Sequence, residues 1–448
     1  MQSRSKYVNL YIIAIMIMMT IFIAIVLPSS KIITDDQTVT IQEIEKDYSV
    51  SDFVSSPIDS LIGINDGETI KASNQGVANG AINLVLLILA IGSFVSICTK
   101  VGIFDQIITM IISSNLSIQK VTVLLIIYFV TCATTFGLYE SAVCYIPLLI
   151  TLYKRYGVSP LYAIKLLILS VSVGYIASPI NPFATIIADQ IANNQTNLFG
   201  FRSLLLLVLV LSLIIYLCVE LKRINPQVIE KSDVSTGEHV KYINIALFLM
   251  PYIYMTIGFI PSLLFSATMA TVTIGFIASG IIIGLTNRMT LTETIDNLFG
   301  GVNNFMIIAV SITLARTVYI ILFNSHVIDT IVYHIVMFIS PFSDLLIVIG
   351  LCVLFLLLGY IIPSPSALAM ITLPIIAPAL ELVGISIAST VTIFLMTHGL
   401  SKMYAMTSPL VIASLNEAGV TYKAYLSSIK DYMYFVYVLV IILAVVAL

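Results

Sequence analysis

One segment of this chain occurs twice, and the two copies lie 227 positions apart. The first copy is Thr134–Asn193 and the second is Ile361–Val420, and they align without a gap. Residues that break helices or are small recur at matched positions: Pro147 with Pro374, Gly157 with Gly384, Ser159 with Ser386, and Pro182 with Pro409. Paired interruptions of this kind in apolar segments are the best sequence indication of the binding site of a secondary transporter.

The composition predicts an all-α polytopic membrane protein. Hydrophobic residues make up 59% of the chain and charged residues 10%, whereas soluble domains carry roughly a quarter charged residues. Apolar runs of about 18 or more residues recur, each long enough to cross a bilayer as a helix. The net charge is −3 and no basic patch is concentrated anywhere, so we expect no nucleic-acid partner. The five cysteines all lie in apolar surroundings, so neither a disulfide framework nor a zinc site is expected.

The apolar pattern predicts nine transmembrane helices, two of them interrupted, and two re-entrant hairpins. We expect residues 1–75 to hold the first helix and an acidic external loop, and 76–221 to hold repeat one. Residues 222–301 form a linker with connecting helices, and 302–448 form repeat two. The expected crossings are Tyr7–Leu27, Ala78–Ser96, Pro160–Ile191 (interrupted), Ser203–Glu220, Ile243–Ile260, Leu263–Leu285, Val302–Leu322, Ile387–Leu415 (interrupted) and Met433–Leu448.

Each repeat contains a pair of short apolar arms. In repeat one these are Val121–Ala133 and Ser141–Leu152, and at 1.5 Å per residue each spans roughly 18–20 Å. A hydrocarbon core is about 30 Å thick, so we expect a hairpin that turns at mid-membrane around Thr134–Glu140. The corresponding arms of repeat two are Leu345–Ile361 and Ala367–Leu380. Irregular backbone at that depth must be buried or line a wet cavity, so the hairpin tips are expected at a site.

The distribution of positive residues predicts the topology. With the N-terminus in the cytoplasm, 13 lysines and arginines fall inside and only Lys31, Lys46, Lys71 and Arg202 fall outside. Cytoplasmic loops normally carry this excess. Under this topology the two repeats are inverted, and Lys165, Arg316 and Lys402 lie within the membrane. We expect a multi-pass protein of the bacterial plasma membrane.

The chemistry is expected where the tips meet the breaks in the interrupted helices. Pro179 and Pro182 remove backbone donors and free carbonyls in the first break. Carbonyls with Ser178, Asn181 and Thr185 offer oxygen ligands for a cation, and half-helix N-termini can receive a substrate carboxylate. The substrate-binding set predicted from both repeats is Thr134, Thr135, Gly137, Glu140, Ser141, Asn181, Ser364, Ser366, Thr407 and Ser408. The alternative is that the breaks only kink packed helices.

Charges at membrane depth are costly and mark function. Glu140 could bind a cationic substrate group, carry a coupling proton, or form a structural ion pair. Arg316 could face a substrate carboxylate or reach the outer surface. His398 could be a packed polar residue or a proton carrier, and Lys402 is a further candidate charge partner.

Four segments resemble a known family, the YfcC/ArcD-type carriers of the ion transporter superfamily, to which anaerobic C4-dicarboxylate carriers are related. They are GSFVSICTKVGIFD (Gly92–Asp105), TTFGLYESAVCYIPLLI (Thr134–Ile150), SPINPFAT (Ser178–Thr185) and PSPSALAMITLPIIAPALELVGIS (Pro363–Ser386). The resemblance implies a homodimer with elevator-like movement of hairpins and broken helices. It also implies substrates among basic amino acids, other amino acids or small carboxylates.

One segment departs from the family pattern. Relatives carry an acidic, glycine-rich stretch with a Ser-Asn pair before the second break, but Met396–Lys402 contains neither an acid nor an asparagine. Lys402 could replace a bound cation with a tethered one, which favours exchange over ion-coupled uptake. We therefore expect exchange of basic amino acids, with Na⁺- or H⁺-coupled carriage of small carboxylates as the alternative. No other cofactor or metal is expected.

An enzyme or a channel is the remote alternative. The sequence contains no H-E-x-x-H motif and no clustered acids of the kind a membrane enzyme would use. Two inverted and non-identical breaks also fit alternating access better than a channel filter.

Overall fold

The structure is a computed structural model. It describes residues 2–35, 38–44, 49–62, 82–113, 117–176, 178–181, 183–194, 196, 198–227, 242–258, 269–339, 342–381 and 384–447.

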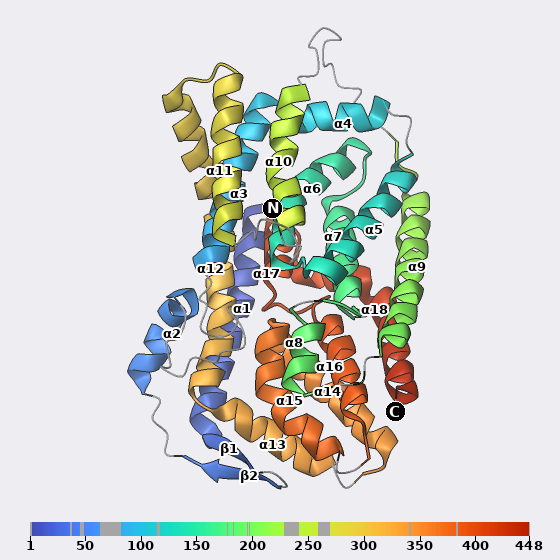
Figure 1. The fold of residues 1–448 in the computed structure, drawn as a ribbon. Coiled ribbons are helices and arrows are strands. Elements are labelled where there is room, and N and C mark those ends of the chain that lie inside the picture. Colours follow the sequence, from blue (N-terminus) through green and yellow to red (C-terminus); the bar gives the residue numbers. More distant parts are fainter. Residues whose placement is uncertain are drawn as a thin grey trace.

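The described residues form helices throughout, apart from one β-hairpin (Figure 1). The elements of the first half are α1 (Gln2–Val26), β1 (Ser30–Asp35), β2 (Thr38–Glu43), α2 (Val50–Ile62), α3 (Ile82–Val101), α4 (Ile103–Ser113), α5 (Ile118–Phe136), the 3₁₀ helix η1 (Glu140–Tyr145), α6 (Ile146–Arg155), α7 (Pro160–Ile176), α8 (Thr185–Ile191) and α9 (Phe199–Ile224). Those of the second half are α10 (Tyr242–Gly258), α11 (Met269–Thr286), α12 (Leu291–Asn324), α13 (Val327–Ile339), α14 (Asp344–Ile361), α15 (Pro365–Glu381), α16 (Ile387–Ser401), α17 (Pro409–Ala418) and α18 (Tyr422–Val446).

Among the described residues, six helices are long and apolar enough to cross a membrane. They lie in α3, α5, α9, α12, α14 and α18. Shorter apolar helices include α7 and α16, which are the first halves of the two interrupted helices. The all-helical polytopic class expected from the sequence is confirmed.

The helices pack into two bundles. The first bundle contains α1, α2, α3, α10, α11 and α12, and the second contains α5–α9 and α14–α18. In the first bundle α3 and α12 cross so closely that a Cβ on Gly301 would lie 2.2 Å from the carbonyl oxygen of Gly92. In the second bundle α7 and α16 cross, and each hairpin packs on one of them.

The two hairpins approach the middle of the molecule from opposite ends. In Figure 1, α4 lies across the top near α6, and α13 lies across the bottom near α14 and α15. The arms of the first hairpin are antiparallel, because Thr122 Oγ1 is 2.7 Å from Tyr153 Oη and Tyr128 Oη is 2.6 Å from Tyr145 Oη. Both tips face the two breaks.

Helix α9 is joined to both interrupted helices by polar contacts in which Lys165, Arg202 and Thr392 are buried. Near its C-terminal end Glu220 forms an ion pair with Lys165 of α7. Near its N-terminal end Arg202 pairs with Asp189 at 3.3 Å and donates to Thr392 Oγ1 of α16 at 3.1 Å. Lys165 and Thr392 are equivalent positions under the 227-residue offset, so α9 makes a corresponding contact with each repeat.

Three details differ from the sequence-based expectation. Helix α5 extends about one turn beyond each end of the predicted arm, so its 19 residues span about 28 Å. The argument that this arm is too short to cross was therefore wrong. The helix continues through Thr134 and Thr135, whose hydroxyls donate to backbone carbonyl oxygens, and it ends at Gly137 with its positive φ. The acidic loop is also not irregular throughout: it contains β1, β2 and α2. Finally, α12 begins at Leu291, eleven residues before the predicted crossing Val302–Leu322.

Candidate functional site

Asn181 organises the first break, between α7 and α8. Its Oδ1 accepts hydrogen bonds from the backbone N–H groups of Phe183 and Ala184, both at 2.9 Å. Its Nδ2 donates to the carbonyl oxygen of Ala133 in α5 at 2.7 Å. The side chain is fully buried. A single amide therefore serves donors and acceptors that the broken helix leaves without helical partners.

Ser178 and Thr185 also bond to the backbone. Ser178 Oγ donates to the carbonyl oxygen of Thr134 at 3.0 Å and accepts from the Asn181 N–H at 2.8 Å. Thr185 Oγ1 donates to the carbonyl oxygen of Ser178 at 2.9 Å. The three predicted cation ligands are thus brought together, and each side chain bonds to the backbone. Their role as cation ligands stays a prediction.

The first hairpin tip begins where α5 ends at Gly137. Gly137 has a φ of 68°, and a Cβ there would lie 2.3 Å from the Phe183 ring of the break, so only glycine fits. Thr134 and Thr135 lie in the last turn of α5 and donate to the carbonyl oxygens of Gly174 and Thr131 at 3.2 and 2.6 Å. Ser141 is the next buried polar residue, in η1.

The second tip and break use serines as helix caps. Ser364 Oγ accepts from the N–H of Ala367 at 3.4 Å and lies 3.2 Å from Ser366 Oγ. Ser408 caps α17 by accepting from the N–H of Val411 at 3.4 Å. These caps place the positive ends of α15 and α17 beside the site.

Similar hydrogen bonds join the tip to the break in both repeats. Asn181 donates to Ala133, and Thr407 Oγ1 donates to the carbonyl oxygen of Tyr360, which is the position equivalent to Ala133. Tyr175 Oη donates to the carbonyl oxygen of Gly137 at 2.7 Å in the first tip. Its equivalent, Lys402, donates from Nζ to the carbonyl oxygen of Pro363 at 2.8 Å in the second tip.

Lys402 lies where all four parts meet. Its ammonium is 3.7 Å from the ring centre of Tyr139 in the first tip and 4.7 Å from that of Tyr175 at the end of α7. Tyr139 Oη in turn lies 2.6 Å from Ser408 Oγ of the second break. Lys402 is only 2% exposed. Sequence reasoning missed the two tyrosines, although Tyr175 could have been found as the repeat equivalent of Lys402.

The remaining charged candidates differ in their surroundings. His398 stacks on Phe394 with ring centres 5.8 Å apart, and its Nε2 lies 3.3 Å from the carbonyl oxygen of Ile362. Glu140 is half-buried and begins η1, next to the Lys402 site. Within the described residues, no lysine, arginine or histidine lies within 4.0 Å of its carboxylate. The side chain of Arg316 lies outside the described part of the structure.

The two interrupted helices touch beside this point. A Cβ added to Gly399 of α16 would lie 2.5 Å from the backbone nitrogen of Ile176 in α7. Such contact is compatible only with glycine unless the helices move apart. The close crossing brings the ends of α7 and α16 together, and both breaks follow directly.

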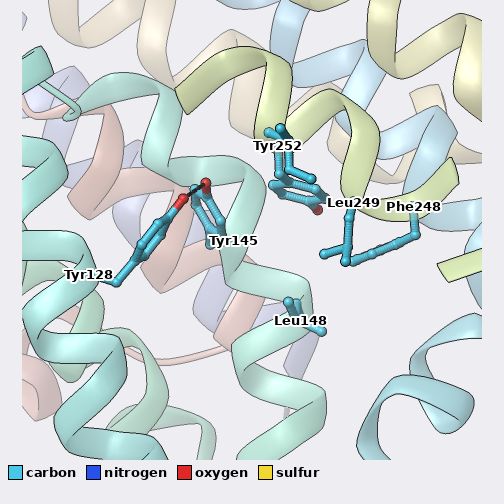
Figure 2. Close-up of a pocket in the computed structure, with 7 residues that line it drawn as sticks. Tyr128, Tyr145, Leu148, Phe248, Leu249 and Tyr252 are labelled. Atoms are coloured by element: carbon cyan, nitrogen blue, oxygen red, sulfur yellow. Dashed lines mark hydrogen bonds between the residues drawn. The ribbon is translucent and has the colours of Figure 1, made fainter. Parts of the chain in front are cut away.

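A separate cavity lies between the first hairpin and α10 (Figure 2). Its volume is about 340 Å³, and it is lined by Tyr128, Tyr145, Leu148, Phe248, Leu249, Tyr252 and Ile253. The lining is apolar apart from tyrosine hydroxyls and carries no charge, so it is unsuited to a charged solute. Within the described ranges no group of three or more His, Cys, Asp and Glu side chains could hold a metal ion.

The sequence model of the family described as "DcuC: C4-dicarboxylate anaerobic carrier" matches residues 6–448. The chain belongs to this family. DcuC-family membership makes it a membrane protein of a carrier class, as its apolar helices also indicate.

Curated relatives of this DcuC-family chain are distant. An uncharacterized protein of Haemophilus influenzae is 24% identical over 326 residues, which cover 68% of this chain and 64% of that protein. The chain thus spans less than two thirds of that relative. The Escherichia coli protein YfcC, provisionally named as a basic amino acid antiporter, is 22% identical over 385 residues, covering 79% of this chain and 76% of YfcC.

Two solved transporter structures are also similar. The Alcanivorax borkumensis YdaH transporter matches with a TM-score of 0.41 at 12% identity, covering 98% of this chain and 97% of that one. Neisseria gonorrhoeae MtrF, described as illuminating a class of antimetabolite efflux pumps, matches with a TM-score of 0.41 at 16% identity, covering 97% and 94%.

Proposed function

We propose that this protein is a secondary active transporter that exchanges amino acids, with basic amino acids favoured, by elevator-like alternating access in the bacterial plasma membrane. One observation carries the proposal: Glu140 is a half-buried carboxylate at the first tip, with no basic side chain of the described residues within 4.0 Å. A carboxylate at membrane depth needs a cationic partner or a proton. The guanidinium or ammonium group of a basic amino acid supplies that partner.

In this proposal, helix N-termini bind the carboxylate group of the substrate. The α15 N-terminus, capped by Ser364, and the α17 N-terminus, capped by Ser408, both begin at the site. Their free N–H groups and positive dipole ends favour a carboxylate. A basic amino acid carries both charges, so it matches Glu140 at one end and the helix N-termini at the other.

The two bundles have different roles in transport under this proposal. In our proposal the second bundle, with both hairpins and both breaks, carries the substrate and moves against the first bundle. The first bundle, with α3 and α12 locked together at Gly92 and Gly301, forms the stationary part and the interface of a homodimer. The N-terminus lies in the cytoplasm.

The alternative is Na⁺- or H⁺-coupled carriage of a small carboxylate. It is favoured by the family description, which names C4-dicarboxylates. The provisional name of YfcC supports the basic amino acid instead. A dicarboxylate would place a second negative charge near Glu140, which is why we favour the amino acid.

Counterflow in proteoliposomes tests the proposal. Vesicles loaded with arginine or ornithine should take up labelled arginine and should not respond to external succinate. Glu140→Gln should abolish basic amino acid exchange. Uptake driven by succinate alone, or a fully active and stable Glu140→Gln protein, would overturn the assignment.

A further inference from the structure

We propose that the Lys402 ammonium is a built-in monovalent cation, which holds the second break against the second tip so that no free ion is needed there. The inference rests on the proposed exchange function, and it specifies how that exchange is coupled. Three features of the surroundings of Lys402 Nζ support it.

The first feature is the set of groups that surrounds the ammonium. Lys402 Nζ has a backbone carbonyl oxygen at 2.8 Å, that of Pro363, and two aromatic faces at 3.7 and 4.7 Å. Carbonyl oxygens and aromatic faces are groups that bind monovalent cations. They come from the second tip, the first tip and the end of α7, so one charge connects three segments.

The second feature is that no carboxylate of the described residues is in direct contact with the ammonium. Among the described residues no Asp or Glu oxygen lies within 4.0 Å of Lys402 Nζ. Lys165, the other buried lysine of the second bundle, does have such a partner in Glu220. Lys165 therefore forms an ordinary ion pair, whereas Lys402 is held as a free cation would be.

The third feature is the position relative to helix ends. Lys402 is the C-cap of α16, and Pro363 comes directly after Ile362, the C-cap of α14. The C-terminal end of a helix carries roughly half a negative charge. The C-terminal ends of α14 and α16 therefore favour a cation here, whereas the N-terminal end of α15, which begins at Pro365, opposes it. The Lys402 ammonium offsets the two C-terminal ends.

The first break shows that the hydrogen bond alone does not require a charge. Its equivalent residue is Tyr175, which makes the matching bond to the tip through a neutral hydroxyl. A charged donor at Lys402 therefore supplies more than the bond. We assign to it the stabilising role of an ion at the second break.

Thermal unfolding of the purified full chain in detergent tests this without any substrate. Wild-type protein should melt at the same temperature in sodium, potassium and choline chloride. Lys402→Ala should melt several degrees lower in choline and regain part of the loss in sodium or potassium, because a ligand that binds only the folded state raises stability. An equal response of wild type and Lys402→Ala to the salts would overturn the proposal.

A matched control separates a cation effect from the loss of a buried lysine. Lys165→Met with Glu220→Gln removes the other buried lysine with its partner, and its melting temperature should not depend on the cation. Lys402→Arg should keep the salt-independence of the wild type. If Lys402→Ala does not fold, Lys402→Gln replaces it. If neither variant folds in any of the three salts, the proposal is overturned, because a free sodium or potassium ion should then substitute for the missing ammonium.

Exchange gives the second measurement. Replacing sodium by choline on both sides should leave wild-type exchange unchanged within about twofold, while Lys402→Ala should lose at least about tenfold in choline and recover in part with sodium. If basic amino acids are not exchanged at all, the proposed function fails, yet the thermal test still decides the role of Lys402.

Discussion

The two breaks perform the same task with different chemistry. In the first, Asn181, Ser178 and Tyr175 bond to the tip through neutral groups, and the Asn181 amide is used in three hydrogen bonds. In the second, Thr407 and Lys402 make the equivalent bonds, and one of them is charged. The duplicated backbone thus accepts different side chains at equivalent positions, as long as the carbonyl oxygens of each tip receive hydrogen bonds. The first break is thus joined to its tip by neutral hydrogen bonds, and the second by one neutral and one charged hydrogen bond.

The largest effect is expected where the two interrupted helices touch. Gly399→Ala should abolish transport and lower the yield of folded protein, because its Cβ would lie 2.5 Å from the Ile176 backbone nitrogen. Relieving this clash would require the main chain of α7 or α16 to move. Size-exclusion profiles and exchange rates measure this. Gly200→Ala is the control, since nothing lies within 4 Å of a Cβ there. Normal exchange by Gly399→Ala would mean that the breaks do not need this close approach.

The next effect concerns Asn181 in the first break. Asn181→Ala should raise the half-saturating substrate concentration at least about tenfold, since it leaves buried backbone groups unsatisfied at about 1–3 kcal/mol each. Ser408→Ala, at the equivalent position, should cost less, because Ser408 only caps α17 and contacts Tyr139. Exchange measured over a range of substrate concentrations gives both values. Equal losses would contradict the difference between the breaks.

The sequence predicted the fold and the position of the site better than the site's internal contacts. The offset matches Pro182 with Pro409, and α7 and α16 end before these positions, as expected. Asn181 and Lys402 were singled out for their residue type, but the partners of Lys402 were not. Tyr139 and Tyr175 face it only because α16 crosses α7 at Gly399, and such long-range packing leaves no periodic pattern in a sequence.

A smaller effect is expected at Tyr139, which links the first tip to the second break. Tyr139→Phe keeps the ring under the Lys402 ammonium and removes only the hydroxyl, which lies 2.6 Å from Ser408 Oγ and bonds to the Lys402 carbonyl oxygen. Exchange should fall a few-fold. Tyr139→Leu also removes the cation–π contact, which contributes about 2 kcal/mol when desolvated. Exchange by this variant should therefore fall further. Identical losses in the two variants would show that the ring face does not stabilise the charge.

The smallest effect is expected where α9 contacts the repeats. Thr392→Val removes one hydroxyl, which accepts from Arg202 Nε at 3.2 Å and Nη2 at 3.1 Å, but the guanidinium keeps Asp189. The free energy of unfolding should therefore fall by roughly 1.5 kcal/mol, the low end for hydrogen bonds to a charged group. Lys165→Met, at the equivalent position of repeat one, removes a whole ion pair and leaves Glu220 without it, so it should cost more. Calorimetry on both variants measures the difference. If Thr392→Val proved the more damaging, α9 would be held mainly through the second repeat, and the two repeats would differ in their anchoring as well as in their breaks.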